Sequence, residues 1–143
     1  LTEFLLFSAS RHQLTEEIIK PLLMKKYIIL CDRYYDSSTA YQGYGGKIDL
    51  EIINRINRIA TNNLVPDLSF LIDINYEENM QRRKISGKRH DRIEQKEKKY
   101  YKKVISGYKE IAKLNPKRFR ILDGKKNIET LHNEILNIIN KTK

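Results

Sequence analysis

The sequence contains very little cysteine, proline and glycine, and these shortages exclude several classes of protein. A single cysteine, Cys31, cannot form an intramolecular disulfide, so a disulfide-stapled scaffold is excluded. Only three prolines and six glycines interrupt apolar residues that recur at regular spacings, which argues against a disordered chain. No apolar run approaches 18 residues, and residues 1–4 do not resemble the basic start of a secretory signal. The sequence therefore favours a globular protein without a membrane partner.

Positive charge is in excess, with 28 Lys and Arg against 18 Asp and Glu and a formal net charge of +10. Such an excess indicates attraction to anions and does not specify a fold. Nucleic acid, an anionic membrane and nucleotide phosphates are the candidate partners, and a solvated lysine-rich surface explains the total equally well. The positions of the arginines are therefore more informative than their number.

Apolar periodicity predicts alternating helices and strands. Helices are expected over 2–25, 50–63, 76–84 and 93–114 and after Asn127, and short buried strands are expected over 27–31, 68–73 and 119–123. The first helix should bury a stripe made of Leu5, Leu6, Ala9, Leu14, Ile18, Ile19 and Leu22. Residues 34–47 are rich in Tyr, Ser and Gly and should form a functional loop, which can include a helical turn. This alternation indicates an α/β fold with a parallel sheet.

The stretch that follows the first predicted strand contains most of the reactive side chains. Asp32 and Arg33 leave that strand together, and ligands of open α/β sheets bind beyond the carboxyl ends of the strands. The planar guanidinium of arginine suits phosphate oxygens, and a neighbouring carboxylate can hold a water on Mg²⁺. Ser38, Tyr41 and Gln42 add groups that can bind a base or a sugar. An ion pair that caps a strand end, beside a polar surface loop, is the alternative interpretation.

Four motifs, in order, resemble those of thymidylate kinases and cover nearly the whole chain. Each matches a different part of the family's pattern: the helix that reads the base, the nucleotide-binding motif, the next strand and the end of the lid. The matching stretches are residues 5–11, residues 32–34 with Ser38 and 40–43, residues 66–73, and residues 91–94.

The resemblance implies a three-layer P-loop kinase-type α/β fold with a parallel sheet and a basic lid at about 82–94. Residues 1–143 would form the C-terminal two thirds of a single domain. The implied reaction is transfer of the ATP γ-phosphoryl group to dTMP, which gives dTDP, with Mg²⁺ as the metal. The implied setting is a cytoplasmic homodimer that binds small-molecule nucleotides and no nucleic acid.

The resemblance also assigns roles to individual residues. In the dTMP site, Phe7 stacks on the pyrimidine, Arg11 donates to a ring carbonyl, and Tyr41 leaves no room for a ribose 2′-hydroxyl. Arg33 bridges the substrate phosphate and the transferred group, and Asp32 reaches Mg²⁺ through a water. Ser38 and Gln42 complete the implied dTMP-binding set.

The implied lid contains several basic residues between which the sequence does not choose. A lid that brings arginine or lysine over ATP stabilises charge and excludes water, although a solvated basic loop has the same composition. The catalytic candidates are Arg82, Arg83, Lys88, Arg89 and Arg92. The implied ATP-binding residues are Arg82, Arg89, Asp123, Gly124 and Lys125, the last three at the loop that approaches adenine.

The Gly-rich phosphate loop that ends in Gly-Lys-Ser/Thr does not occur in the sequence. Residues 43–47 are glycine-rich but lack the required spacing and the hydroxyl residue. Because the chain also begins at Leu1 and not at Met, we expect that roughly the first third of the family's pattern is missing and that these 143 residues alone are inactive. A basic, non-catalytic nucleic-acid-binding module is the alternative function, and a kinase for another nucleoside monophosphate is a third.

Overall fold

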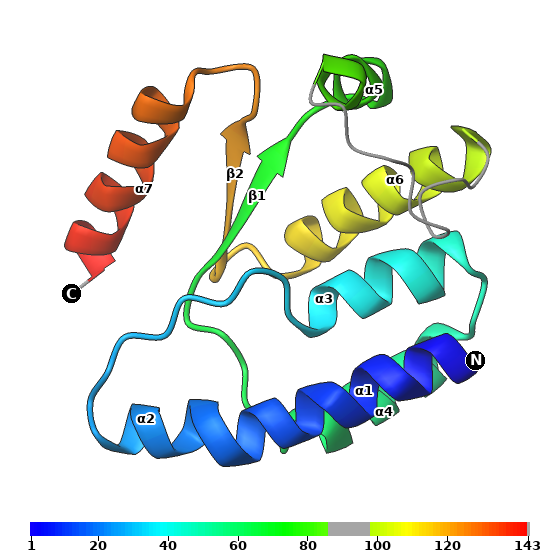
Figure 1. Cartoon of the computed structure of the whole chain (residues 1–143), viewed down its shortest axis with the longest axis vertical. Coiled ribbons are helices and arrows are strands. Elements are labelled where there is room, and N and C mark those ends of the chain that lie inside the picture. The colour runs from blue at the N-terminus through cyan, green and yellow to red at the C-terminus, as the bar shows by residue number, and fades with distance from the viewer. Residues whose placement is uncertain (86–97, 143) are drawn as a thin grey trace.

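The computed structural model describes residues 1–85 and 98–142 (Figure 1). Within these ranges it contains α-helices, two π-helical segments and two strands. In chain order they are α1 (Thr2–Leu14), η1 (Thr15–Ile19), α2 (Lys20–Met24), α3 (Tyr35–Ser38), η2 (Thr39–Gly45), α4 (Leu50–Thr61), β1 (Ser69–Asp73), α5 (Tyr76–Ile85), α6 (Lys98–Leu114), β2 (Phe119–Asp123) and α7 (Ile128–Thr142).

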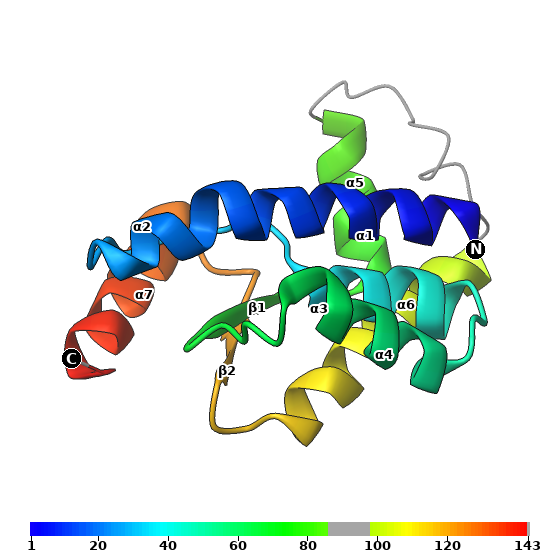
Figure 2. The same ribbon diagram turned by 90° about the horizontal axis from the view of Figure 1, so that it is seen from below.

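The two strands pair in parallel, as the alternation of elements predicts. Their register runs from Ser69 opposite Phe119 to Asp73 opposite Asp123. Both views place α6 and α7 on opposite sides of this pair, so the sheet has helices on both faces (Figures 1 and 2). The prediction of an α/β fold with a parallel sheet is confirmed.

The first predicted helix is present as α1, η1 and α2, which follow one another without a break above α3 and α4 in Figure 2. Pro21 does not end the helix, because it lies in the first turn of α2. The predicted buried stripe is wrong, since Leu5, Leu6, Leu14 and Ile18 are exposed. Ile19 of the stripe is buried as predicted, and the other buried positions of α1 and η1 are Phe4, Ser8 and Thr15. The helix is apolar on several sides, so periodicity alone does not select the packed face.

The predicted strand at 27–31 is absent. Residues 27–31 carry no regular secondary structure, and Tyr27, Ile28 and Leu30 are 60%, 68% and 85% exposed. A strand requires hydrogen bonds to a neighbouring strand, and among the described residues β1 pairs only with β2. Residues 27–31 therefore have the composition of a strand, but the described residues supply no strand with which they could pair.

Residues 35–45, expected to form a loop, are helical as α3 and η2. Close packing of η2 against α6 explains this difference. A Cβ added at Gly45 would lie 2.7 Å from the Tyr100 ring, and one added at Gly107 would lie 2.7 Å from Tyr44. The core at this contact contains Ala40, Val104, Ile111, Ala112 and Phe119. Tertiary contact thus determines the structure of a segment whose composition is typical of a loop.

Candidate nucleotide site

Arg11 of α1 contacts the segment that follows residues 27–31. Its Nη2 donates a hydrogen bond of 2.9 Å to Oγ of Ser38, while its buried Nη1 has no partner among the described residues. Burial lowers the pKa of Arg11, because desolvation disfavours the charged guanidinium. Phe7 lies one turn earlier on the same helix face and is 44% exposed. A half-buried arginine with a free donor next to an exposed aromatic ring is suited to binding a planar ligand that carries a carbonyl.

A second contact ties α1 to the same stretch. The hydroxyl groups of Thr15 and Tyr34 share a hydrogen bond of 2.8 Å, and the guanidinium carbon of Arg11 lies 6.0 Å from the centre of the Tyr34 ring. Burial raises the pKa of Tyr34, so its phenol stays protonated at neutral pH. These contacts hold residues 34–38 against the helix that carries Phe7 and Arg11.

Arg33 has a backbone conformation that is unusual for its residue type. Its φ of 65° lies in the left-handed region, which costs a non-glycine residue about 1–2 kcal/mol. Its guanidinium carbon lies 5.4 Å from the centre of the Tyr41 ring, and the Cys31 thiol donates to its carbonyl oxygen over 3.2 Å. Asp32 and Arg33 are both exposed, so their charged groups face solvent. Strained backbone of this kind is often retained where it aims a functional side chain.

A buried ion pair that the sequence did not reveal anchors the other end of the stretch. Arg118, just before β2, donates to the two carboxylate oxygens of Asp36 over 2.8 and 2.7 Å and to Oγ of Ser69 over 2.7 Å. Burial alone would lower the pKa of Arg118, but the hydrogen bonds to Asp36 and the charge interactions with Asp36 and Tyr35 together outweigh it and raise that pKa. The two residues are far apart in the chain, so no local pattern indicates the pair.

The remaining predicted dTMP-site residues lie on η2. Gln42 is buried and donates from Nε2 to the Glu3 carboxylate over 2.8 Å, so its amide nitrogen is occupied by a contact with α1. Tyr41 contacts Tyr100 and Tyr108 of α6 edge-on. The structure thus brings α1, α3, η2 and α6 together around the predicted site.

The predicted ATP-side residues are described only in part. Arg82 lies on α5, exposed and hydrogen-bonded to Glu78 one turn earlier. Gly124 follows β2 and donates its N–H to the carbonyl oxygen of Asp73 over 2.9 Å, while the N–H of Lys125 bonds the Asp123 carboxylate. This turn lies at the carboxyl edge of the sheet. Lys88, Arg89, Arg92 and the side chain of Arg83 lie outside the described residues.

Residues 43–47 do not form a phosphate loop. Gly43 and Gly45 belong to η2, and Gly46 ends that helix. The rejection of this glycine-rich run as a P-loop is therefore consistent with the structure.

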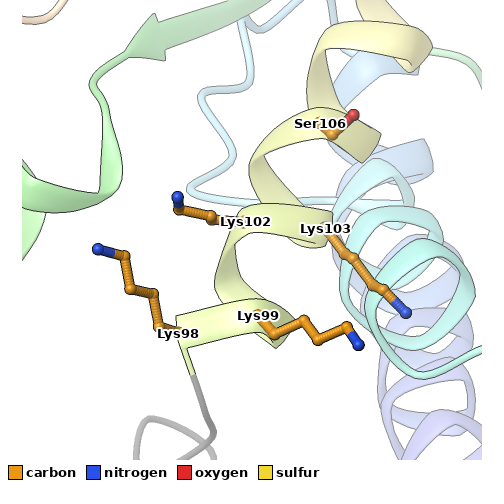
Figure 3. A pocket seen from close by; sticks show the side chains of 5 residues that line it. All are labelled: Lys98, Lys99, Lys102, Lys103 and Ser106. Atoms are coloured by element: carbon orange, nitrogen blue, oxygen red, sulfur yellow. The ribbon is translucent and has the colours of Figure 1, made fainter.

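Four lysines lie close together at the start of α6. Figure 3 shows Lys98, Lys99, Lys102 and Lys103 around a shallow pocket completed by Ser106. Lys98 is partly neutralised, because its Nζ lies 2.9 Å from the Glu77 carboxylate and 5.3 Å from the Tyr76 ring centre. A cluster at one end of one helix is not the long stripe expected of a nucleic-acid-binding surface.

The residues near the site can be tested for a fit to Mg²⁺. In the described part of the chain, no three His, Cys, Asp or Glu side chains cluster closely enough to hold a metal ion. Mg²⁺ usually keeps several waters and takes one or two carboxylates plus substrate phosphates, so the exposed Asp32 carboxylate fits such an ion without a protein cage.

No helix in residues 1–85 or 98–142 has both the length and the apolar character needed to cross a membrane.

A parallel sheet with arginine, hydroxyl and aromatic groups gathered beside it is typical of a nucleotide-binding α/β protein. Residues 1–135 match the family model described as thymidylate kinase. The chain is 39% identical to a thymidylate kinase of Kosmotoga olearia over 135 residues, which cover 94% of this chain and 64% of that protein. It is 42% identical to a thymidylate kinase of an Exiguobacterium species over 134 residues, covering 94% and 63%.

A solved structure gives the same result. The crystal structure of a thymidylate kinase from Ehrlichia chaffeensis matches with a TM-score of 0.76 and 34% identity, covering 98% of this chain and 64% of that one. The chain therefore belongs to the thymidylate kinase family, and it spans slightly less than two thirds of the length of these relatives.

Proposed function

We propose that this chain provides the nucleoside monophosphate site of a kinase that transfers the ATP γ-phosphoryl group to dTMP and forms dTDP. One observation carries the proposal: the buried Nη1 of Arg11 has no partner among the described residues, beside a hydroxyl on Ser38 and an exposed ring on Phe7. A buried donor left without a partner costs about 1–3 kcal/mol, so a ligand acceptor there would recover that energy. The ring carbonyl of a pyrimidine that stacks on Phe7 would be such an acceptor.

The remaining residues take roles that their positions support. Arg33 presents its guanidinium next to Tyr41 and would bind the phosphate at the far end of the same nucleotide. The Tyr41 ring would face the sugar and exclude a 2′-hydroxyl. Asp32 would hold a water of Mg²⁺, and bound Mg²⁺ would neutralise charge on the transferred phosphoryl group. Arg82 and the turn at 123–125 stay predictions for the ATP side, as do the lid residues that lie outside the description.

The first test is nucleotide binding to the 143-residue chain, measured by calorimetry. We expect dTMP to bind, and Arg11→Met to raise its Kd about 10- to 100-fold, the worth of a hydrogen bond from a charged donor in a partly buried site. Arg58→Met, an exposed arginine on α4, is the matched control and should leave the Kd unchanged. Equal binding by the Arg11 variant would show that this arginine does not read the base.

The second test is turnover. The 143 residues alone should show no dTMP-dependent formation of ADP from ATP, because they lack the Gly-rich loop and its lysine. A hybrid chain, in which the part of the Kosmotoga relative left uncovered by the match is joined ahead of Leu1, should supply the loop that the resemblance implies. We expect this hybrid to turn over dTMP with Mg²⁺ and ATP. A hybrid that binds dTMP but transfers no phosphoryl group would contradict the proposed reaction.

Membership of the thymidylate kinase family favours this function over a nucleic-acid-binding module. A homodimer is also proposed, and the exposed Leu1 together with Leu5 and Leu6 of α1 offers an apolar surface for it. Sedimentation of the protein tests that proposal, with a monomer at micromolar concentration as the contrary result. A cytoplasmic location and a single domain over residues 1–143 stay predictions.

A further inference from the structure

The ring of Tyr41 is held from α6 at two places about two helical turns apart. The rings of Tyr100 and Tyr108 meet it edge-on, with centroid separations of 6.4 and 6.3 Å and interplanar angles of 66° and 82°. The Tyr100 hydroxyl also donates to the Tyr41 carbonyl oxygen over 3.0 Å. With the Arg33 guanidinium 5.4 Å from the ring centre, Tyr41 is contacted by two rings and one cation. Such a ring has little freedom to rotate.

Tyr108 makes a second contact, on the side of the site that faces the base. Its hydroxyl donates to Oγ of Ser37 over 2.8 Å, and the next residue, Ser38, accepts the hydrogen bond from Arg11. Burial raises the pKa of Tyr108, so its phenol remains a donor at neutral pH. One side chain of α6 therefore contacts both the ring beside the sugar position and the turn beside the base position.

Close packing at two glycines fixes the separation between α6 and η2. An added Cβ at Gly107, next to Tyr108, would lie within 2.8 Å of three atoms of Tyr44, and one at Gly45 would lie 2.7 Å from Tyr100. Small residues at both positions let the two helices interlock. A shift of α6 along η2 would therefore bring these side chains into collision.

We propose that Tyr108 is a positioning residue for sugar selection, acting through Tyr41 and the Ser37–Ser38 turn. Steric exclusion of a hydroxyl group works only if the excluding ring cannot move aside. The Tyr108 ring keeps Tyr41 in place, and the Tyr108 hydroxyl keeps the turn in place. This inference rests on the proposed function, because it takes Tyr41 as the residue that faces the deoxyribose.

The test compares two probes that carry the same base, dTMP and 5-methyluridine 5′-monophosphate, titrated into the 143-residue chain. Tyr108→Leu removes the ring and should reduce the ratio of their Kd values roughly 3- to 10-fold, the range expected for loss of an edge-on aromatic contact. Tyr108→Phe keeps the ring and should preserve that ratio, while raising both Kd values about 3- to 10-fold through loss of the hydroxyl contact. Ser37→Ala removes the same hydrogen bond from the other side and should reproduce the Tyr108→Phe values.

Ile111→Ala is the matched control for a purely structural effect. Ile111 is buried on the same helix and belongs to the core cluster. Its truncation should lower the stability and leave the ratio of Kd values unchanged. An equal fall of the ratio in Ile111→Ala, or an unchanged ratio in a folded Tyr108→Leu, would overturn the inference.

The outcomes also separate this inference from the proposed function. A wild-type chain that binds neither probe removes the proposed function, and the inference falls with it. A wild-type chain that prefers dTMP, with Tyr108 variants that keep both Kd values, removes the inference alone. If Tyr108→Leu does not fold, Tyr108→Phe and Ser37→Ala decide: matching increases of Kd support the role of Tyr108, and unchanged values refute it.

Discussion

Breaking the ion pair between Asp36 and Arg118 by changing one partner should cost a large share of the free energy of unfolding. Their side chains are only 13% and 11% exposed, and Arg118 spans both carboxylate oxygens. Asp36→Asn keeps the shape of the side chain but leaves the guanidinium buried without a counter-charge. Breaking such a pair costs about 3–5 kcal/mol, against a total of about 5–15 kcal/mol for a domain.

Urea unfolding followed by circular dichroism measures the effect. The exposed pair of Lys109 and Asp73, with N···O 2.8 Å and side chains 52% and 31% exposed, is the control. Lys109→Met should cost less than about 1 kcal/mol, as exposed ion pairs do. The double variant Asp36→Leu/Arg118→Met should cost less than either single change, because no charge is then left buried alone. A loss below about 1 kcal/mol for Asp36→Asn would refute the reasoning.

Gly124→Ala should lower stability by about 1–3 kcal/mol in thermal unfolding, because the new Cβ would lie 2.4 Å from Cγ2 of Ile74; an unchanged melting temperature would mean that this turn yields freely. Tyr100→Phe should flatten the fall of melting temperature between pH 10 and 12. Burial raises the pKa of Tyr100 to about 12 from its ordinary 10.0, so the protonated phenol stabilises the fold fully below pH 10, and this contribution is lost as the pH rises to 12. An equal fall of melting temperature with pH in both proteins would contradict this. Arg33→Ala should keep the melting temperature, since the side chain is exposed. It should lower kcat of the hybrid chain by a factor that corresponds to about 2–4 kcal/mol. Unchanged turnover would show that Arg33 contacts Tyr41 but has no role in the reaction.

Features that depend on neighbouring residues could be predicted from the sequence. The helix predicted from residue 50 begins there, and the carboxylate of the preceding Asp49 accepts from the N–H groups of Glu51 and Ile52 over 2.7 and 3.2 Å. Asn127 likewise accepts from the N–H of Thr130 over 2.8 Å at the start of α7. Capping is local chemistry, so residue type and spacing are enough to predict it.

Features that depend on distant residues could not be predicted in this way. The apolar run at 27–31 is typical of a buried strand, but strand formation requires a partner that the described residues do not supply. The segment 39–45 has the glycine content of a loop, yet its contact with α6 favours a helical turn. The buried face of α1 was predicted wrongly for the same reason. Apolar residues lie on several sides of this helix, so the elements that pack against it determine which side is buried.

The candidate site shows the same division. Phe7, Arg11, Ser38 and Tyr41 could be predicted as site residues because short motifs contain them, and the structure brings Arg11 and Ser38 together. Tyr108 and the Asp36–Arg118 pair were missed, because their partners are 71 and 82 residues away in the chain. Supporting residues of this kind have no local signature, although they hold the motif residues in place.

The interlock between α6 and η2 also limits how the sequence can evolve. Glycine is needed at 107 because Tyr44 occupies the space where a Cβ would lie, and the Tyr100 ring occupies the corresponding space at Gly45. One of the Tyr44 atoms that a Cβ at 107 would meet is Cβ itself, so a larger residue at 107 requires glycine at 44 or a shift of the two helices, and the effect of either substitution depends on the other. Substitutions at these two pairs should therefore be epistatic, and homologues that diverge here should change both members of a pair together.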